Sequence, residues 1–155
     1  MKAVTMAAVL GGLISTQVLA GGIQVEESIT LKAKPAAVWA LVGNFNGLHR
    51  WHPAVVGSSL TAPDVRVLTL GNGATITETQ LSEDNEQLRY SYRIDASPLP
   101  VADYESMIKL TAQDDGTLVT WSSSFDAAGA TDQEAADVIR GIYKAGLNQL
   151  SAFYN

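Results

Sequence analysis

The sequence predicts an α+β fold in which a curved antiparallel sheet of about seven strands surrounds a long C-terminal helix. Three observations predict it. Short β-prone runs separated by turn signals fill residues 55–125. Two short helical segments lie between these runs and a first strand. An amphipathic stretch ends the chain, and a helix of that kind needs an apolar surface to cover its stripe.

Length and composition predict one packed domain and exclude several classes of site. The chain has 155 residues, of which 46% are hydrophobic and 17% are charged. The net charge of −6 argues against nucleic acid as a partner, because that affinity depends on basic patches. The absence of Cys excludes disulfides, cysteine-ligated zinc, iron–sulfur clusters and thiol nucleophiles.

The first twenty residues resemble a secretory signal peptide. Lys2 is followed by an apolar run over residues 3–14, and the segment ends in VLA, a small-x-small cleavage pattern. Cleavage after Ala20 predicts a single mature domain over residues 21–155, a periplasmic location and no remaining membrane span. The alternative is an uncleaved N-terminal anchor, although the apolar run is shorter than the roughly 20 residues of a membrane span.

The elements follow from local signals along the chain. The first strand is predicted over residues 23–33, where β-branched residues alternate loosely. Pro35 is tolerated at the first position of a helix, and Gly43 ends the helix that it begins. A second short helix is predicted over residues 48–53, stopped by Pro53. The later strands are predicted over residues 55–60, 65–70, 74–81, 88–95, 103–110 and 118–125.

The last strands and the final helix have the clearest patterns. Residues 88–95 and 103–110 each alternate apolar with polar side chains, which is typical of a strand with one buried face. Thr131 and Glu134 have the spacing of a helical capping box. The apolar stripe of the helix that follows consists of Val138, Ile139, Ile142, Tyr143, Leu147, Leu150 and Phe153.

Four stretches together carry a resemblance to a known superfamily. They are VEESITLKAKPAAVWALVGNFNGLHRWHPAV, LGNGATITETQL, YSYRIDASPLPVADYES and the segment 126–155. In this order and spacing the chain resembles the START-like helix-grip (SRPBCC) superfamily, in particular its polyketide cyclase/dehydrase-like branch and the MxaD-type exported proteins. The resemblance covers residues 24–153 and implies a helix-grip fold with a ligand cavity between the sheet and the C-terminal helix.

The resemblance also implies which positions contact a ligand. A gate loop corresponds to Gly71, Asn72 and Gly73, and a latch loop to Pro98, Leu99 and Pro100. The ligand-contacting positions fall at His52, Glu78, Tyr92, Ile94, Tyr104, Trp121, Val138 and Ile142. Two of them depart from the hormone-receptor relatives. His52 replaces a pocket basic residue and Trp121 replaces a second carboxylate, which argues against a receptor-like acidic ligand.

Glu78 and the two histidines each have more than one interpretation. Glu78 shares a strand face with Ile76, which indicates that its carboxylate faces a pocket. The alternatives are that Glu78 points to solvent, or that it pairs with an arginine on a neighbouring strand. A buried carboxyl with a raised pKa could also act as a general base. His49 and His52 share a helix face, but local spacing supplies no third ligand, so we predict no metal and no cofactor.

The tryptophans and helix glycines have packing explanations beside functional ones. Trp39 is expected in the core, whereas the resemblance places Trp121 at the pocket. Gly141 and Gly146 lie inside the final helix, where each costs about 1 kcal/mol relative to alanine. They make room for a ligand or a loop, or they allow close packing on the sheet.

These observations predict an exported binding protein that holds a small hydrophobic or amphipathic molecule, with Glu78 and His52 fixing its orientation. No nucleophile with an orienting base stands out, which favours binding without turnover. One alternative is a cyclase/dehydrase-type enzyme with Glu78 as base. Another, implied by the MxaD-type resemblance, is an accessory protein of a periplasmic dehydrogenase and its cytochrome. The last is a scaffold whose cavity is filled by side chains.

Overall fold

The computed structural model describes residues 21–155, and the predicted signal peptide lies outside the described residues. Seven strands form one sheet in the order β1-β7-β6-β5-β4-β3-β2. All neighbouring strands pair antiparallel. The predicted α+β fold, with two short helices after the first strand and a long C-terminal helix, is confirmed.

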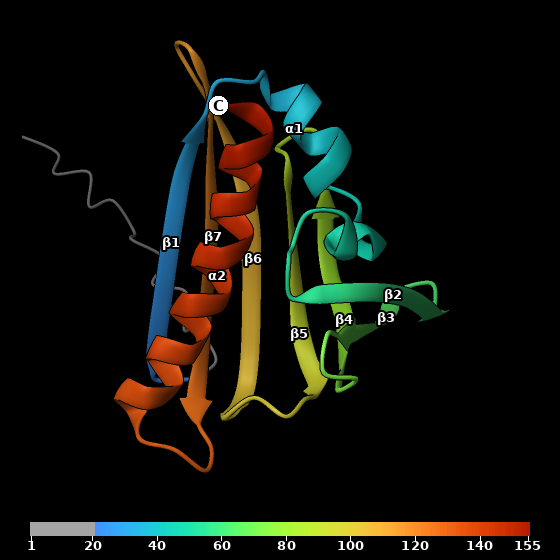
Figure 1. Cartoon of the computed structure of the whole chain (residues 1–155), viewed down its shortest axis with the longest axis vertical. Helices are drawn as coiled ribbons and strands as arrows, with labels where there is room; N and C mark the ends of the chain where they lie inside the picture. Colours follow the sequence, from blue (N-terminus) through green and yellow to red (C-terminus); the bar gives the residue numbers. More distant parts are fainter. Residues whose placement is uncertain (1–20) are drawn as a thin grey trace, which may run out of the picture.

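The long helix lies along the concave face of the sheet and packs mainly on β1, while the short helices cover its other end (Figure 1). The elements are β1 (Ile23–Leu31), α1 (Pro35–Val42), η1 (Phe45–Arg50), β2 (Val55–Ala62), β3 (Val65–Leu70), β4 (Thr75–Asp84), β5 (Arg89–Ala96), β6 (Val101–Gln113), β7 (Gly116–Ala127) and α2 (Asp132–Tyr154). Because α2 covers one side of the concave face and the short helices cover the other, the middle of that face lies between α2 and η1.

The second short helix begins three residues earlier than the sequence predicts and is a 3-10 helix. The side chain of Asn44 accepts a hydrogen bond from the backbone N–H of Asn46, at 3.0 Å, and so caps its first turn. The turn signal Asn46-Gly47 therefore lies inside this helix. The segment that follows brings Trp51 and His52 onto the concave face, where both are buried.

The capping box of α2 is present as predicted. Thr131 Oγ1 accepts from the Glu134 N–H at 3.2 Å, and Glu134 Oε2 accepts from the Thr131 N–H at 2.9 Å. Most of the predicted stripe is buried, including Ile139, Leu147 and Leu150. Val138 is 38% exposed and Phe153 is 50% exposed, so these two members of the predicted stripe are not covered by the sheet.

The sheet separates locally between β5 and β6. Their pairing runs from Arg89↔Lys109 to Arg93↔Glu105 and stops there, although β5 continues to Ala96 and β6 begins at Val101. The register of β6 with β7 shifts between Ala102 and Glu105, and Asp103 within this bulge has a φ of +49°. The two strands diverge toward the loop that joins them (Figure 1).

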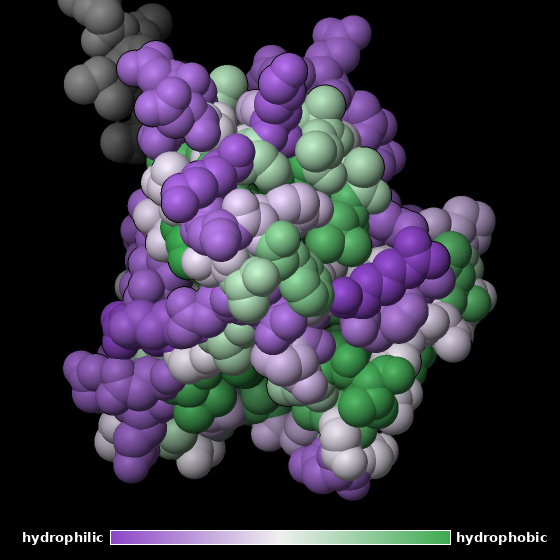
Figure 2. Space-filling model, turned by 45° about the horizontal axis from the view of Figure 1, so that its top comes forward, coloured by the Kyte–Doolittle hydropathy of each residue, from purple (hydrophilic) through white to green (hydrophobic). Residues whose placement is uncertain are grey.

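The surface carries mixed polarity. On the face that Figure 2 shows, hydrophilic residues predominate and hydrophobic ones form small separate patches. Within residues 21–155, no helix combines the length and apolar character needed to cross a membrane.

Candidate ligand cavity

A cavity of about 300 Å³ lies between α2 and the concave face of the sheet. Its volume is at the small end of the range of ligand pockets. The wall is formed mainly by apolar and aromatic side chains from η1, the loop after it, β2 to β7 and α2. The lining residues are Leu48, His52, Ala54, Val55, Leu68, Leu70, Ile76, Glu78, Tyr92, Ile94, Leu99, Tyr104, Trp121, Val138, Ile139, Ile142 and Tyr143.

The structure brings the eight predicted ligand-contacting residues together on the wall of this one cavity. They come from the segment after η1, from β4, β5, β6 and β7, and from α2. Of the two predicted loops, only Leu99 of the latch reaches the wall, together with Leu70, which precedes the gate. Gly71, Asn72 and Gly73 form an exposed turn, and Pro98 and Pro100 also lie off the wall.

Glu78 faces inward and also pairs with an arginine on the neighbouring strand. Arg66 lies directly opposite it in the β3–β4 register and is 0% exposed, while Glu78 is 4% exposed. Arg66 Nε donates to Glu78 Oε2 at 2.7 Å, and Nη2 lies 2.6 Å from the same oxygen. The Arg66 guanidinium also lies over the Phe45 ring and donates to the Phe45 carbonyl. Glu78 therefore both faces the pocket and pairs with an arginine on a neighbouring strand, two interpretations that the sequence left as alternatives.

The opposite charges of Arg66 and Glu78 are buried together. Burial raises the pKa of Glu78, and the neighbouring Arg66 opposes that rise. Both Arg66 contacts fall on Oε2, and the second oxygen, Oε1, takes no part in this ion pair. Because Glu78 lines the cavity and Arg66 does not, Oε1 is the carboxylate oxygen left to accept from a molecule inside it.

His52 lines the cavity with its ring, and both of its ring nitrogens form hydrogen bonds within the protein. Nε2 lies 2.9 Å from the carbonyl oxygen of Ile142, which can only accept, so Nε2 carries the proton. Nδ1 accepts from the Ala54 N–H at 3.2 Å. Burial lowers the pKa of His52 and keeps the ring neutral. The His52 side chain therefore holds the loop after η1 against α2. Of the two residues predicted to orient a ligand, His52 and Glu78, it is Glu78 that can still form a hydrogen bond with one.

Aromatic rings fill the space where α2 meets the sheet. Trp121 stacks on Tyr143 with ring centroids 4.3 Å apart and lies 5.5 Å from the Trp51 ring. A Cβ at Gly146 would stand 2.7 Å from His52 Cδ2, 3.0 Å from Trp51 Cζ3 and 3.1 Å from Trp121 Cζ3. Close packing therefore accounts for Gly146. A Cβ at Gly141 would meet no atom within 4 Å among the described residues.

A cluster of buried hydroxyl groups lies beside these rings. Ser106 Oγ donates to the Ser122 carbonyl at 2.8 Å and lies 3.1 Å from the Tyr143 hydroxyl. The Trp121 indole N–H donates to both the Tyr92 hydroxyl, at 3.0 Å, and Ser106 Oγ, at 3.1 Å. The hydroxyls of Tyr104 and Tyr143 are also hydrogen-bonded to each other. Sequence reasoning missed Ser106 as part of the site, although it shares the inward face of its strand with Tyr104.

The tyrosine hydroxyls of this cluster are held in their neutral form. Burial is the main cause that raises the pKa of Tyr92 and of Tyr104, and it raises that of Tyr143 to about 12. At neutral pH each is therefore a hydrogen-bond donor and acceptor without charge.

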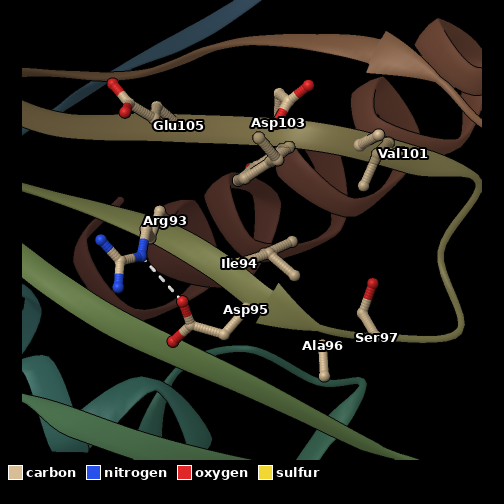
Figure 3. Close-up of a pocket in the computed structure, with 10 residues that line it drawn as sticks. Arg93, Ile94, Asp95, Ala96, Ser97, Val101, Asp103 and Glu105 are labelled. Carbon is tan, nitrogen blue, oxygen red and sulfur yellow. Dashed lines mark hydrogen bonds and ion pairs between the residues drawn. The ribbon is translucent and has the colours of Figure 1, made fainter. Parts of the chain in front are cut away.

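A second hollow, of about 510 Å³, lies on the outer face of the sheet where β5 and β6 separate. Its rim carries the Arg93–Asp95 ion pair, at 2.7 Å, together with Asp103 and Glu105 (Figure 3). Ile94 lies between the two strands with α2 behind it (Figure 3). Ile94 and Tyr104 line both this hollow and the inner cavity, so their side chains form the partition between the two.

The two histidines do not come together as metal ligands. His49 is exposed, whereas His52 is buried with both nitrogens bonded. Within residues 21–155, no group of three or more His, Asp or Glu side chains is arranged to hold a metal ion.

Comparison with known proteins places these features in a family. The sequence profile of the family described as "Polyketide cyclase / dehydrase and lipid transport" matches residues 22–152. The chain belongs to this family. No curated protein matches it significantly in sequence.

Solved structures of the family's superfamily have the same fold. The protein XoxI from Bacillus cereus is 32% identical with a TM-score of 0.83, over 86% of this chain and 96% of its own. The Zhui aromatase/cyclase from a Streptomyces species is 18% identical, with a TM-score of 0.69 over 84% of this chain and 92% of its own. A START superfamily protein from Mycobacterium smegmatis is 13% identical, with a TM-score of 0.67 over 85% of this chain and 99% of its own. The last two likenesses concern the fold alone, which is the helix-grip fold that the sequence predicts.

Proposed function

We propose that this protein is an exported binding protein that holds one small apolar or amphipathic molecule in the cavity between α2 and the sheet. The observation that carries the proposal is the cavity itself, a space of about 300 Å³ with an apolar and aromatic wall and few polar atoms. Pockets that bind small organic molecules combine these features, since apolar area supplies affinity and a few polar groups fix orientation. Export follows from the signal-like N-terminal segment of the sequence.

Binding without turnover is supported by how the polar groups are engaged. Glu78 is held by Arg66, and both nitrogens of His52 are bonded within the protein. Ser106, in the hydroxyl cluster beside the cavity, donates to a backbone carbonyl, and its hydrogen-bond partners within residues 21–155 include no imidazole or carboxylate that would activate it. A carrier needs no such activation.

One observation favours a cyclase or dehydrase reaction as the second candidate. Burial raises the pKa of Glu78, and Arg66 contacts Oε2 and not Oε1, which suits a general base in an apolar site. Glu78→Gln separates the two functions. It abolishes turnover in an enzyme while a ligand still binds, whereas in a binding protein only affinity changes.

The role of an accessory to a periplasmic dehydrogenase and its cytochrome rests on the sequence resemblance. It predicts co-purification with such an enzyme and no dependence on an occupied cavity. Affinity purification from the periplasm, with the cavity filled by substitution, tests it against the binding function.

Native mass spectrometry and calorimetry test the proposed function. Protein purified without denaturation should carry an added mass that is lost on denaturation. Stripped protein should bind the neutral aromatic probe 1-naphthol with one site by isothermal titration calorimetry. Ile142→Trp, which places an indole in the cavity wall, should abolish that binding.

The matched control is Val56→Trp, because Val56 is 63% exposed and lies outside the cavity. It should bind the probe like the parent protein. A probe that binds neither protein, or that binds Ile142→Trp as well as Val56→Trp, would contradict the proposed function.

A further inference from the structure

We propose that Asn72, in the turn between β3 and β4, is a site of spontaneous covalent modification, in which its side-chain amide is lost through a cyclic imide formed with the backbone nitrogen of Gly73. The products are aspartate and isoaspartate at this position. The chain has two Asn-Gly dipeptides, at residues 46–47 and 72–73, and their surroundings differ. This chemistry belongs to the turn and is independent of what the cavity binds.

The reaction needs only the chain and water. The backbone nitrogen of Gly73 attacks Asn72 Cγ, so that a new N–Cγ bond forms while the Cγ–Nδ2 bond breaks. The amide proton of Gly73 leaves with Nδ2 as ammonia, and a succinimide ring remains. Water then opens this ring. Cleavage of the new bond gives aspartate, whereas cleavage of the original peptide bond gives isoaspartate, in which the main chain runs through the side-chain carbon. Water is consumed, ammonia is released, and nothing is oxidised or reduced.

The Asn72 carboxamide is held over the peptide bond that supplies the attacking nitrogen. Its Oδ1 accepts a hydrogen bond from the Ala74 N–H at 3.0 Å, which is the Asx-turn contact of an asparagine with the backbone two residues ahead. This contact folds the side chain back over the Asn72–Gly73 peptide. The same N–H faces the oxygen that becomes negative as the nitrogen attacks Cγ, and a donor placed there stabilises the developing charge.

Gly73 leaves the approach to Cγ open. Its φ of +83° lies in the left-handed region that favours glycine, and a Cβ there would meet no atom within 4 Å among residues 21–155. Asn72 and Gly73 are both exposed, so water and base reach the reacting atoms. The Gly73 N–H donates to the Leu70 carbonyl at 2.9 Å, and this bond must open before the nitrogen attacks. Bonds in exposed turns open at a small cost in free energy.

The other dipeptide, Asn46-Gly47, has the same covalent chemistry but is held in η1. Gly47 is buried, and its N–H donates to the Asn44 carbonyl at 2.8 Å. Asn46 Oδ1 accepts from Ser58 Oγ at 2.6 Å, so its carboxamide is tied to β2 and not to the backbone that follows it. Attack there requires both the helical turn and this contact to open, and we expect Asn46 to be protected.

The two products of Asn72 have different effects on the turn. The Leu70 N–H donates to the Ala74 carbonyl at 2.8 Å and closes the β3–β4 connection. Aspartate keeps a side-chain oxygen that accepts from the Ala74 N–H, so the turn persists. Isoaspartate adds one methylene to the main chain inside the turn and loses that side-chain oxygen. Only the isoaspartyl product should therefore loosen the turn beside Leu70, a residue of the cavity wall.

Ageing of the purified protein, followed by peptide mapping, tests the inference. Protein incubated at mildly alkaline pH is digested in acid, and the mass gain of an amide-to-acid conversion is measured in the peptides that contain Asn46 and Asn72. We expect Asn72 to convert about tenfold faster than Asn46 or more, because Asn46 must first give up its hydrogen bond to Ser58. Isoaspartate, counted by enzymatic methylation with a labelled methyl donor, should map to the Asn72 peptide.

Three controls assign the reaction to the folded turn. In protein denatured with urea, Asn46 and Asn72 should convert at similar rates, because both precede glycine and neither is held. Asn72→Gln should form no isoaspartate in the turn, because its longer side chain closes the ring poorly. Asn72→Asp supplies one of the products without ageing, and it should melt like the parent protein, whereas the isoaspartyl fraction of aged protein should melt at a lower temperature.

Two results would overturn the inference. One is that Asn72 stays intact in the folded protein or converts no faster than Asn46. The other is that the difference between the two sites persists in urea, which would assign it to the flanking sequence and not to the fold. Neither result bears on the proposed function, whose test is the binding of 1-naphthol.

Discussion

Replacing Gly146 with alanine should destabilise the protein even though alanine favours helices. The new methyl group would meet carbon atoms of three buried rings at 2.7 to 3.1 Å, which is closer than van der Waals contact allows. Overpacking of a buried site costs about 1–3 kcal/mol, and the helix propensity gained is about 1 kcal/mol. Gly141→Ala on the same helix gains the same propensity and meets nothing within 4 Å among the described residues.

The difference between the two variants isolates the packing contribution, because propensity cancels. Gly146→Ala should be about 1–3 kcal/mol less stable than Gly141→Ala, which corresponds to roughly 3–10 °C in melting temperature for a domain of this size. Urea unfolding followed by tryptophan fluorescence measures it. Equal stability of the two variants would refute the argument that Gly146 is required by the rings of His52, Trp51 and Trp121.

Three further predictions concern the ion pair, the buried histidine and the helix cap. Arg66→Met should lower the free energy of unfolding in urea by about 3–5 kcal/mol, because it leaves Glu78 buried without a partner. The double variant Arg66→Met with Glu78→Met should recover most of that loss. A double variant no more stable than the single one would contradict this. Burial lowers the pKa of His52 below its ordinary value of 6.5 in the folded state. The unfolded chain therefore binds the extra proton first, and stability should fall by about 1.4 kcal/mol per unit as the pH drops below 6.5 toward the folded pKa. His52→Gln should lack this part of the slope, and identical slopes would count against the neutral ring. Thr131→Ala should cost about 1 kcal/mol by thermal unfolding, and no change would mean that the capping box adds nothing.

The alternation of side chains could predict the strands because one face of each is buried. Residues 88–95 and 103–110 are examples, and their observed strands, Arg89–Ala96 and Val101–Gln113, overlap the predictions closely. The start of β5 differs by one residue because Leu88 has a φ of +52° and belongs to the turn. Ends of this kind depend on single backbone conformations, which the apolar pattern does not determine.

Arg66 could not be placed from the sequence because both faces of its strand are apolar. Val65 and Val67 lie on one face and Leu68 and Leu70 on the other, so the period of two does not say which face is inward. Its partner, Glu78, follows from the register across the turn at residues 71–73. That register becomes known only when the strands are paired.

The hydroxyl cluster is still further from what local patterns can predict. Ser106 joins side chains from β5, β7 and α2, and their arrangement depends on how the sheet curves beneath the helix. Each residue alone is consistent with ordinary core packing. The resemblance to the superfamily supplied the positions of the wall, while the hydrogen bonds that decide its chemistry required the structure.

Because the pairing of β5 with β6 ends early, the sheet has two parts at this end that no backbone pairing joins. Past Arg93 and Glu105, the described strands β1, β7 and β6, on which α2 packs, are joined to the other four by the β5–β6 loop, by the segment that contains α1 and η1, and by side-chain contacts. At this end, the contacts that join the two parts are made by side chains, among them the hydrogen bonds from His52 to the Ile142 carbonyl and from Trp121 to the Tyr92 hydroxyl. The cavity therefore has one boundary, at Ile94 and Tyr104, that is closed by side chains and by no strand pairing.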